Sequence, residues 1–331
     1  MTALARPRSR LGLSLRNPAA RWQRWSETAA PAPDTPTGLG APMPRLPALD
    51  GLRGVAVIGV LFFHGGFSWA TGGFLGVSTF FTLSGFLITN LLVREHDRTQ
   101  TIRLRAFWSR RFRRLLPAAL AALVLIALYG QVYASPEQLQ DLRGDALAAL
   151  AYVANWRLLF EGKSYGDLFS APSPVQHFWS LSIEEQFYVL FPILVYVSLR
   201  VGGRRLLTGV LVAAAAASVA TSFALSGSVD HVYYGTDTRA FELLAGALFA
   251  VWWSGRTVDS SARFGSWSRA AFGAVAVAAL AATVWSWTFA EETSERLGRG
   301  GLALHAVLVV AVIAAIVRRS LLATVLSFAP L

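Results

Sequence analysis

The chain has 331 residues, of which 54% are hydrophobic, a formal net charge of +11 at neutral pH, and no cysteine. A mean hydropathy of +0.47 and repeated apolar runs of about twenty residues are typical of a polytopic membrane protein and exclude an ordinary soluble domain. The basic residues lie between the apolar runs, as cytoplasmic loops prefer, so the charge indicates no nucleic-acid partner, and the absence of cysteine excludes disulfides, thiolate nucleophiles and cysteine metal ligands.

Residues 1–44 differ from the rest of the chain. They are rich in Arg, Pro and Ala and contain no apolar run long enough for a signal peptide. This composition predicts a disordered basic cytoplasmic tail, the alternative being a start codon assigned too far upstream. Residues 45–331 then form one membrane-embedded domain.

The apolar runs predict an all-α transmembrane helical bundle with about eight complete spans. A ninth span begins near Ser320 and is cut off at Leu331, so we expect the domain to be truncated at its C-terminus. Lys163 is the only lysine in a chain rich in Arg, Ala and Gly, which favours a GC-rich bacterium, and we expect a multi-pass protein of the inner membrane. The predicted spans are residues 52–70, 73–93, 115–134, 177–199, 206–226, 239–254, 270–290 and 300–317.

The first span carries ionisable residues in an otherwise apolar run: Asp50, Arg53 and His64. Arg53 and His64 are eleven residues apart, so both project from one helix face, about 16 Å apart along the axis. Ionisable groups inside a span usually face a cavity or another helix. Taken alone, His64 is explained by a hydrogen bond to a neighbouring helix and Arg53 by extension to the membrane surface. Together they predict a functional face.

A strongly basic segment follows the second span and ends in Arg-Arg-Phe-Arg-Arg-Leu-Leu-Pro. Its Arg-x-x-Arg spacing places two guanidinium groups on one helix face, and forked donors at this spacing suit a phosphorylated ligand. The alternative is that the segment only obeys the preference for positive cytoplasmic loops. The sequence has no Walker-type loop, so we expect no nucleotide hydrolysis. The candidate donor-binding residues are Arg110, Arg111 and Arg114.

Residues 142–160 have a short apolar core that contains Asn155 and Arg157. If this segment does not cross the membrane, eight arginines after residue 199 face the cytoplasm and three face outward, whereas a crossing would reverse the distribution. We therefore expect one re-entrant or interfacial helix on the outer side, with the N-terminus of the chain in the cytoplasm.

Two further groups of polar residues open later spans. His177 and Glu184 are seven residues apart and share a helix face, with Glu185 on the adjacent one, while Arg239 and Glu242 stand at i and i+3. The structural alternatives are interhelical hydrogen bonds and, for Arg239, an ion pair within its own helix. For Ser84 in the second span, the alternative is that a small residue lets two helices pack closely. The candidate acceptor or pore residues are His177, Glu184, Glu185, Arg239, Glu242 and Ser84.

Five segments carry a combined pattern. They are 45–54 with His64, 73–89, 110–117, Gln-His-Phe-Trp-Ser-Leu-Ser-Ile-Glu-Glu-Gln-Phe-Tyr at 176–188, and 234–240. In this order they resemble the acyltransferase 3 family of integral-membrane O-acyltransferases, and the resemblance covers about residues 45–331. The chain is similar in particular to the bacterial branch whose members often carry a C-terminal extracytoplasmic SGNH hydrolase-like domain.

The resemblance implies transfer of an acyl group, usually acetyl, from cytoplasmic acyl-CoA to a hydroxyl of a cell-envelope glycan or another acceptor. The phosphates of coenzyme A would lie against Arg111 and Arg114, with Arg53 at the pore mouth and the pantetheine arm running toward His64. Acyl-CoA is then a substrate, and we expect no bound cofactor and no metal. The other expected partners are a glycan or small-molecule hydroxyl acceptor and the lipid bilayer.

In this interpretation a neutral imidazole at His64 acts as general base on the acceptor hydroxyl or carries the acyl group itself. Burial would lower its pKa and keep the basic form available. Asp50 and Arg53 belong to the same catalytic group, and Arg239 or Ser84 would donate a hydrogen bond to the oxyanion.

Two features depart from the family pattern. Ser78 stands where members often have an acidic residue, and the chain stops before the usual last helices and before any SGNH domain, which leaves that domain as an absent partner. Two alternatives stay open. One is a transporter of an acylated lipid or sugar precursor, although the chain shows no internal repeat, and the other is an inactive truncated relative that serves as a scaffold.

Overall fold

The computed structural model describes residues 46–161, 173–254, 266–318 and 321–327, and these residues contain helices and no strands. This confirms the predicted all-α class. Five helical segments are long and apolar enough to cross a membrane by length and composition. The predicted tail, residues 1–44, lies outside the described residues. The five segments are α2 (Pro47–His64), α3 (Leu75–Thr99), α4 (Leu104–Tyr133), α7 (Phe178–Ala224) and Leu297–Val317, the last formed by η2 (Leu297–Gly301) and α11 (Leu302–Val317).

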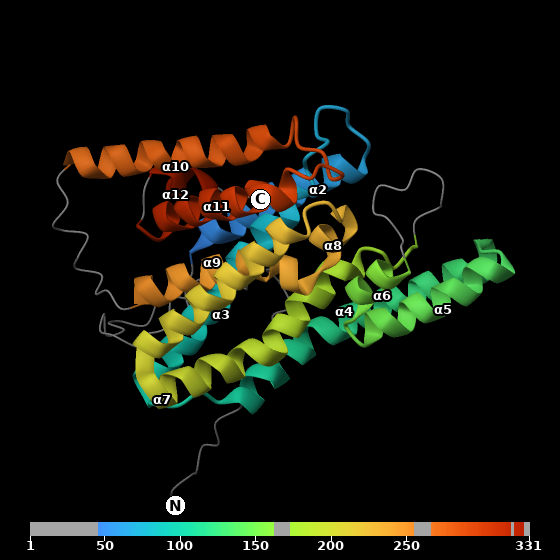
Figure 1. Cartoon of the computed structure of the whole chain (residues 1–331), viewed down its shortest axis with the longest axis horizontal. Helices are drawn as coiled ribbons and strands as arrows, with labels where there is room; N and C mark the ends of the chain where they lie inside the picture. The colour runs from blue at the N-terminus through green and yellow to red at the C-terminus, as the bar shows by residue number, and fades with distance from the viewer. Residues whose placement is uncertain (1–45, 162–172, 255–265, 319–320, 328–331) are drawn as a thin grey trace, which may run out of the picture. The chain divides into compact units, whose positions relative to one another are not determined.

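The remaining predicted spans correspond to shorter or less apolar helices. α9 (Thr236–Ser254) occupies the predicted sixth span and α10 (Ser266–Ser286) the seventh. Of the predicted ninth span, the described residues form α12 (Leu321–Leu326). The helices α10, α11 and α12 lie together beside α2 on one side of the bundle, while α4 and α7 run along the other side (Figure 1). The other helices are α5 (Pro136–Leu150), α6 (Ala154–Phe160) and α8 (Val229–Tyr234).

The helical segment α7 contains the fourth and fifth predicted spans. Its 47 residues would measure about 70 Å as one straight helix, about twice the thickness of the hydrocarbon core of a bilayer. Instead, two helices meet at a kink at Gly203, between the two predicted spans, where a φ of 62° lies in the left-handed region that favours glycine. The next residue, Arg204, anchors the bend because it donates to Asp97 of α3 at 2.6 Å and to the Val251 carbonyl of α9 at 3.1 Å.

The most closely packed helix pair is α3 with α9, in the middle of the bundle (Figure 1). Two glycines allow this approach. A Cβ on Gly85 would overlap the Leu243 carbonyl, and a Cβ on Gly246 would overlap the Thr82 carbonyl. Small residues let helix backbones approach closely in membranes, so this contact fixes the depth of the polar side chains that α3 carries.

The segment expected as one helix at 142–160 consists of two helices. A capping box between Ser135 and Gln138 begins α5, and the chain breaks between α5 and α6 at Tyr152, which has a φ of 55°. A left-handed non-glycine residue ends a helix, so the prediction of one continuous helix was wrong in this respect. Neither helix is among the five long apolar segments of the described residues.

The polar residues of this segment hold it against the bundle. Asn155 is buried and donates to the Tyr234 carbonyl at 2.9 Å and to Thr236 Oγ1 at 3.0 Å. Arg157 forms an ion pair with Asp145 at 2.7 Å. Segments of this length are tolerated at membrane depth when their polar groups find partners in the protein, and these contacts supply such partners.

Candidate functional site

The structure brings His64 and His177 together. His64 ends α2 and His177 immediately precedes α7, and their ring centroids lie 4.6 Å apart in an edge-to-face arrangement. His64 Nδ1 lies 2.8 Å from the Val60 carbonyl oxygen. A carbonyl only accepts hydrogen bonds, so Nδ1 carries the proton and Nε2 holds the lone pair of the neutral ring. The local geometry therefore presents Nε2 as the basic atom.

The surroundings of His177 favour its neutral form. Part of the side chain is exposed, but the neighbouring protein partly desolvates the ring, and a positive charge on His64 would repel a second one. Both effects lower the pKa of His177, the desolvation more strongly. The neutral form of His177 is therefore favoured at neutral pH.

This lowered pKa predicts a pH-dependent stability. The unfolded ring titrates near about pH 6.5, so below this pH the unfolded state binds more protons than the folded one. The stabilisation is complete above about pH 6.5 and is lost as the pH falls from there through the folded pKa. We expect the melting temperature in detergent to fall on acidification, and to fall less in His177→Gln. The control is His96→Gln, which removes a histidine from the last turn of α3 and should keep the wild-type pH dependence. Equal pH dependence in wild type and His177→Gln would contradict the assignment.

Ser84 and Glu184 form a second polar contact farther along α7. Ser84 Oγ donates to Glu184 Oε1 at 2.6 Å, which joins α3 to α7. Glu184 lies two turns from His177, about 10 Å along the helix. The charges of Arg53 and Arg111 both lie near enough to act on Glu184. The predicted face with His177 and Glu184 is therefore polar along its length.

Arg53 remains on the face predicted from its spacing to His64 within α2. Its Nη1 lies 3.0 Å from Asp50 Oδ1, and the Arg53 and Asp50 side chains are 36% and 73% exposed. An exposed ion pair of this kind contributes little to stability, so both groups stay available to a ligand. The sequence grouped these two residues with His64, and the structure places them at the other end of the same helix.

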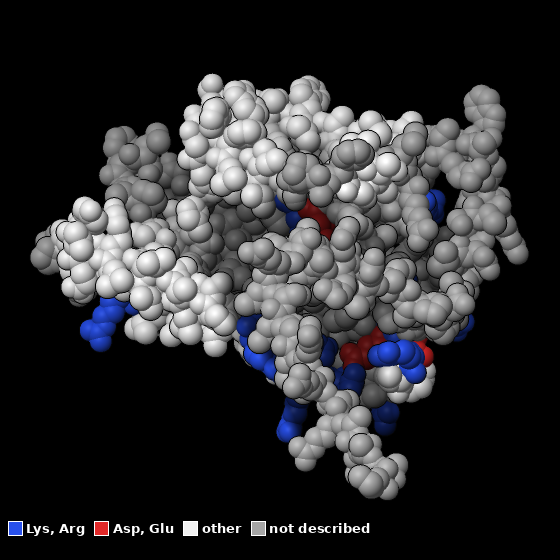
Figure 2. All heavy atoms as spheres, turned by 180° about the vertical axis from the view of Figure 1, so that it is seen from behind, with Lys and Arg blue, Asp and Glu red and all other residues white. Residues whose placement is uncertain are grey.

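Arg111 points inward, unlike its neighbours in the basic segment. It forms an ion pair with Glu185 at 3.1 Å, and its guanidinium carbon lies 3.1 Å from the centroid of the Tyr188 ring. Glu185 is 2% exposed, so this contact pairs a buried carboxylate. Arg110 and Arg114 are exposed. Within the predicted donor-binding group, Arg111 thus has a structural partner, whereas Arg110 and Arg114 face outward. On the face shown in Figure 2, most of the described basic side chains lie toward one end.

Arg239 lies fully buried at the centre of another cluster. Its Nη2 donates to Ser78 Oγ at 3.1 Å and lies 3.5 Å from Glu242 Oε2. Three aromatic rings surround the guanidinium carbon at 5.5 to 5.7 Å, those of Phe81, Trp179 and Tyr233. The expected ion pair within the helix is present but long, and Ser78, noted as a departure from the family pattern, supplies the shorter contact.

Sequence reasoning missed two residues of these clusters. His305 of α11 is buried and lies 3.1 Å from Thr79 Oγ1, next to Ser78. An ionisable residue in an apolar span is itself a functional signal, and His305 carries that signal in the sequence. Tyr188 has no comparable signal, because its role depends on the packing of α4 against α7.

The chain matches a protein family over most of its length. The acyltransferase domain of the acyltransferase 3 family matches residues 46–328. The chain is 42% identical over 292 residues to the peptidoglycan O-acetyltransferase OatA of Listeria monocytogenes, covering 86% of this chain and 46% of the relative. It is 38% identical over 295 residues to the putative peptidoglycan O-acetyltransferase YrhL of Bacillus subtilis, with the same coverage of 86% and 46%.

A third relative is shorter in its match. The O-acetyltransferase OatA of Staphylococcus aureus is 42% identical over 211 residues, which is 63% of this chain and 35% of the relative. The chain thus spans about half the length, or less, of these curated relatives. No solved structure matches it. With the apolar helices, the buried polar clusters and a family match over residues 46–328, this integral membrane protein belongs to the acyltransferase 3 family.

Proposed function

We propose that the protein is an O-acetyltransferase that moves an acetyl group from acyl-CoA on the cytoplasmic side to a hydroxyl of a cell-envelope glycan, with peptidoglycan as the acceptor. The observation that supports it best is the paired imidazoles of His64 and His177, with Nε2 of His64 basic. The names of the relatives supply the acceptor class.

The proposed chemistry uses His64 as a base. The acceptor hydroxyl oxygen bonds to the thioester carbonyl carbon while Nε2 takes the hydroxyl proton. The carbon–sulfur bond then breaks, coenzyme A leaves as the thiolate, and the proton on Nε2 passes to the sulfur. In the carrier version, Nε2 itself bonds to the carbonyl carbon and coenzyme A leaves as the thiolate. The hydroxyl oxygen then bonds to that carbon, the carbon–Nε2 bond breaks, and the hydroxyl proton passes by way of Nε2 to the thiolate.

The donor would lie with its phosphates at the exposed guanidinium groups of Arg110 and Arg114, where charge-assisted bonds to phosphate are available. Arg53 lies between that end and His64, eleven residues away on the same helix. Glu184, which accepts a hydrogen bond from Ser84, would hold α7 against α3 rather than touch the reacting atoms.

Transfer of radiolabel from acetyl-CoA tests this function. Membranes that carry the protein receive labelled acetyl-CoA and purified peptidoglycan, and we expect base-labile label in the glycan. Label that enters sealed vesicles without forming an ester would support the transporter alternative. If the protein binds acetyl-CoA but label appears neither in the glycan nor inside the vesicles, the result would support the alternative of an inactive scaffold.

The proposed orientation places the N-terminus in the cytoplasm and α5 and α6 on the outer side. The chain has no cysteine, so single cysteines report side cleanly. We expect Ala134→Cys and Ser164→Cys, the latter outside the described residues, to react with an impermeant maleimide in intact spheroplasts. Thr101→Cys, exposed before α4, should react only after permeabilisation. Labelling at 134 with protection at 164 would show that the segment crosses.

A further inference from the structure

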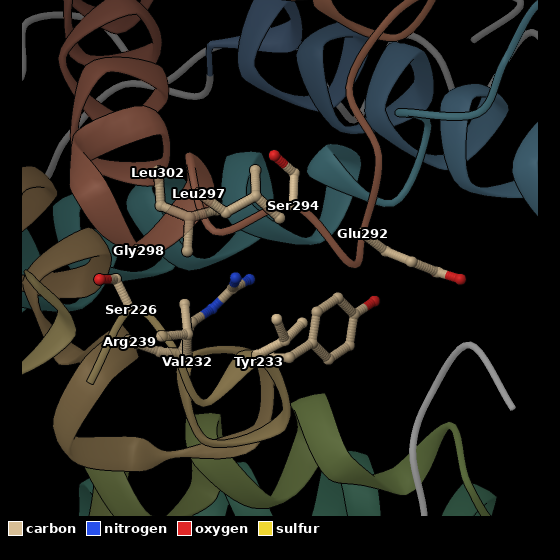
Figure 3. A pocket seen from close by; sticks show the side chains of 10 residues that line it. Ser226, Val232, Tyr233, Arg239, Glu292, Ser294, Leu297, Gly298 and Leu302 are labelled. Carbon is tan, nitrogen blue, oxygen red and sulfur yellow. The ribbon is translucent and has the colours of Figure 1, made fainter.

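Arg239 is a buried cation with few hydrogen bonds. Its Nε and Nη1 have no hydrogen-bond partner among the described residues. The close-up in Figure 3 shows the guanidinium between Val232 and Leu297, with Tyr233 beside it. The space that these residues line has no room for a water molecule. Because a buried charge is costly unless it is compensated, this cation needs stabilisation of another kind.

Aromatic rings from three helices supply that stabilisation. The Arg239 guanidinium carbon lies 5.5 to 5.7 Å from three ring centroids, and each ring belongs to a buried residue. A guanidinium within about 6 Å of the centroid of an aromatic ring is attracted by the electrons of the ring face, more strongly where water is excluded. The start of α9 is thereby joined to three other helices. The rings are those of Phe81 in α3, Trp179 in α7 and Tyr233 in α8.

Trp179 connects this cation to the histidine pair. It is the second residue of α7, two positions after His177, and its ring centroid lies 4.8 Å from that of Tyr233. On the other side of His177, Gln176 Nε2 donates to the Tyr234 hydroxyl at 3.0 Å. The backbone N–H of Trp179 donates to the Gln176 carbonyl at 3.0 Å, which closes the turn. His177 therefore stands between two buried residues that both contact α8.

His177 itself is an exposed residue of this turn, and so is its neighbour His64 at the end of α2. A single edge-to-face contact between two exposed rings does not fix the position of a turn. The buried contacts of Trp179 can do so, because side chains in a close-packed interior pass displacements to their neighbours. A change at Arg239 should therefore move Trp179 and, with it, His177.

We propose that Arg239 is a positioning residue, which acts through Trp179 to hold the His177 ring against His64. Its guanidinium is enclosed by the protein, so it does not touch the reacting atoms. In place of the hydrogen bond to an oxyanion expected from the sequence, Arg239 sets the geometry of the histidine pair. The assignment rests on the proposed acetyl transfer in one respect, namely that the histidine pair is the catalytic site.

Two variants break the link at different points. Trp179→Leu removes the ring and leaves Arg239 beside Glu242. The double variant Arg239→Met with Glu242→Gln removes the cation without leaving a buried carboxylate alone, which would be strongly destabilising. Trp179→Phe keeps an aromatic ring and should behave as wild type. Arg204→Met is the matched control, because Arg204 also contacts α9, but at the kink of α7, so its loss should lower the melting temperature and leave the histidine pair unchanged.

The first measurement is the pKa of His177, from NMR titration of histidine-labelled protein in nanodiscs, with His177→Gln to assign its signal among the five histidines. In wild type, desolvation of the ring and the charge of His64 lower this pKa. Displacement of the turn removes both effects, so the pKa should rise toward about 6.5 in Trp179→Leu and in the double variant. Arg204→Met should keep the wild-type pKa. An unchanged pKa in both link variants would overturn the proposal.

Steady-state kinetics separate failure of the positioning role from failure of the proposed function. A displacement of about 1 Å at a reacting centre can cost about 10²-fold in rate. We expect kcat to fall about 10²-fold in Trp179→Leu and in the double variant, with the KM for acetyl-CoA unchanged. If the pKa of His177 shifts as expected in a protein that transfers no acetyl group, the positioning role stands and the proposed function fails. If wild type transfers acetyl and both link variants keep its kcat, the positioning role fails alone.

Discussion

Acetyl transfer by the His64→Ala variant is expected to fall about 10²–10⁴-fold if His64 is a general base, and to background if it carries the acyl group. The bond from Nδ1 to the Val60 carbonyl leaves Nε2 as the basic atom of the neutral ring, and alanine removes that atom. The measurement is the initial rate of transfer from labelled acetyl-CoA in proteoliposomes, together with acetyl-CoA binding, which should be retained.

The matched control is His96→Ala, which removes an imidazole at the last turn of α3. It should keep the wild-type rate. Added imidazole should partly restore His64→Ala if the residue is a base. A His64→Ala protein that folds and keeps most of its activity would exclude both roles.

The second large effect separates Arg111 from Arg114. Arg111→Ala leaves Glu185 buried without its cation, and removing one partner of a buried ion pair costs about 3–5 kcal/mol. We expect this variant to lose most of its folded yield, while the double variant Arg111→Met with Glu185→Gln recovers much of it. The measurement is the folded fraction by size-exclusion chromatography and the melting temperature in detergent.

Arg114→Ala should behave differently, because its side chain is exposed. We expect wild-type stability and an increase of about tenfold in the KM for acetyl-CoA, the loss of one charge-assisted contact to phosphate. A stable Arg111→Ala variant with a raised donor KM would show that Arg111 binds donor directly. No change in the donor KM of Arg114→Ala would leave the basic segment with a role in topology alone.

The sequence predicted the helices well where hydropathy alone decides. It placed the spans of α9 and α11 within three residues, because each is an apolar run bounded by polar residues, whereas α3 continues through polar residues beyond the predicted end at residue 93. It separated the two halves of α7 because Arg200, Gly202 and Arg205 interrupt the apolar run. It could not indicate that helical hydrogen bonding continues up to a single left-handed glycine.

The candidate site was predictable along one helix and not between helices. The shared face of Arg53 and His64 follows from helical periodicity. The contact of His64 with His177 joins residues 113 positions apart, and only the folded chain brings the end of α2 to the start of α7. The inward turn of Arg111 was equally hidden, because the choice between Glu185 and a ligand phosphate depends on how α4 meets α7.

The bend at Gly203 affects how the protein resists degradation. Three arginines, Arg200, Arg204 and Arg205, stand at this bend, and trypsin-like proteases cut after such residues. Proteases need several residues of extended chain, however, and here the backbone stays helical on both sides while Arg204 is held to α3 and α9. Cleavage at the bend therefore requires local unfolding of α7, so a connection between two spans that would ordinarily be an exposed loop is protected from proteolysis.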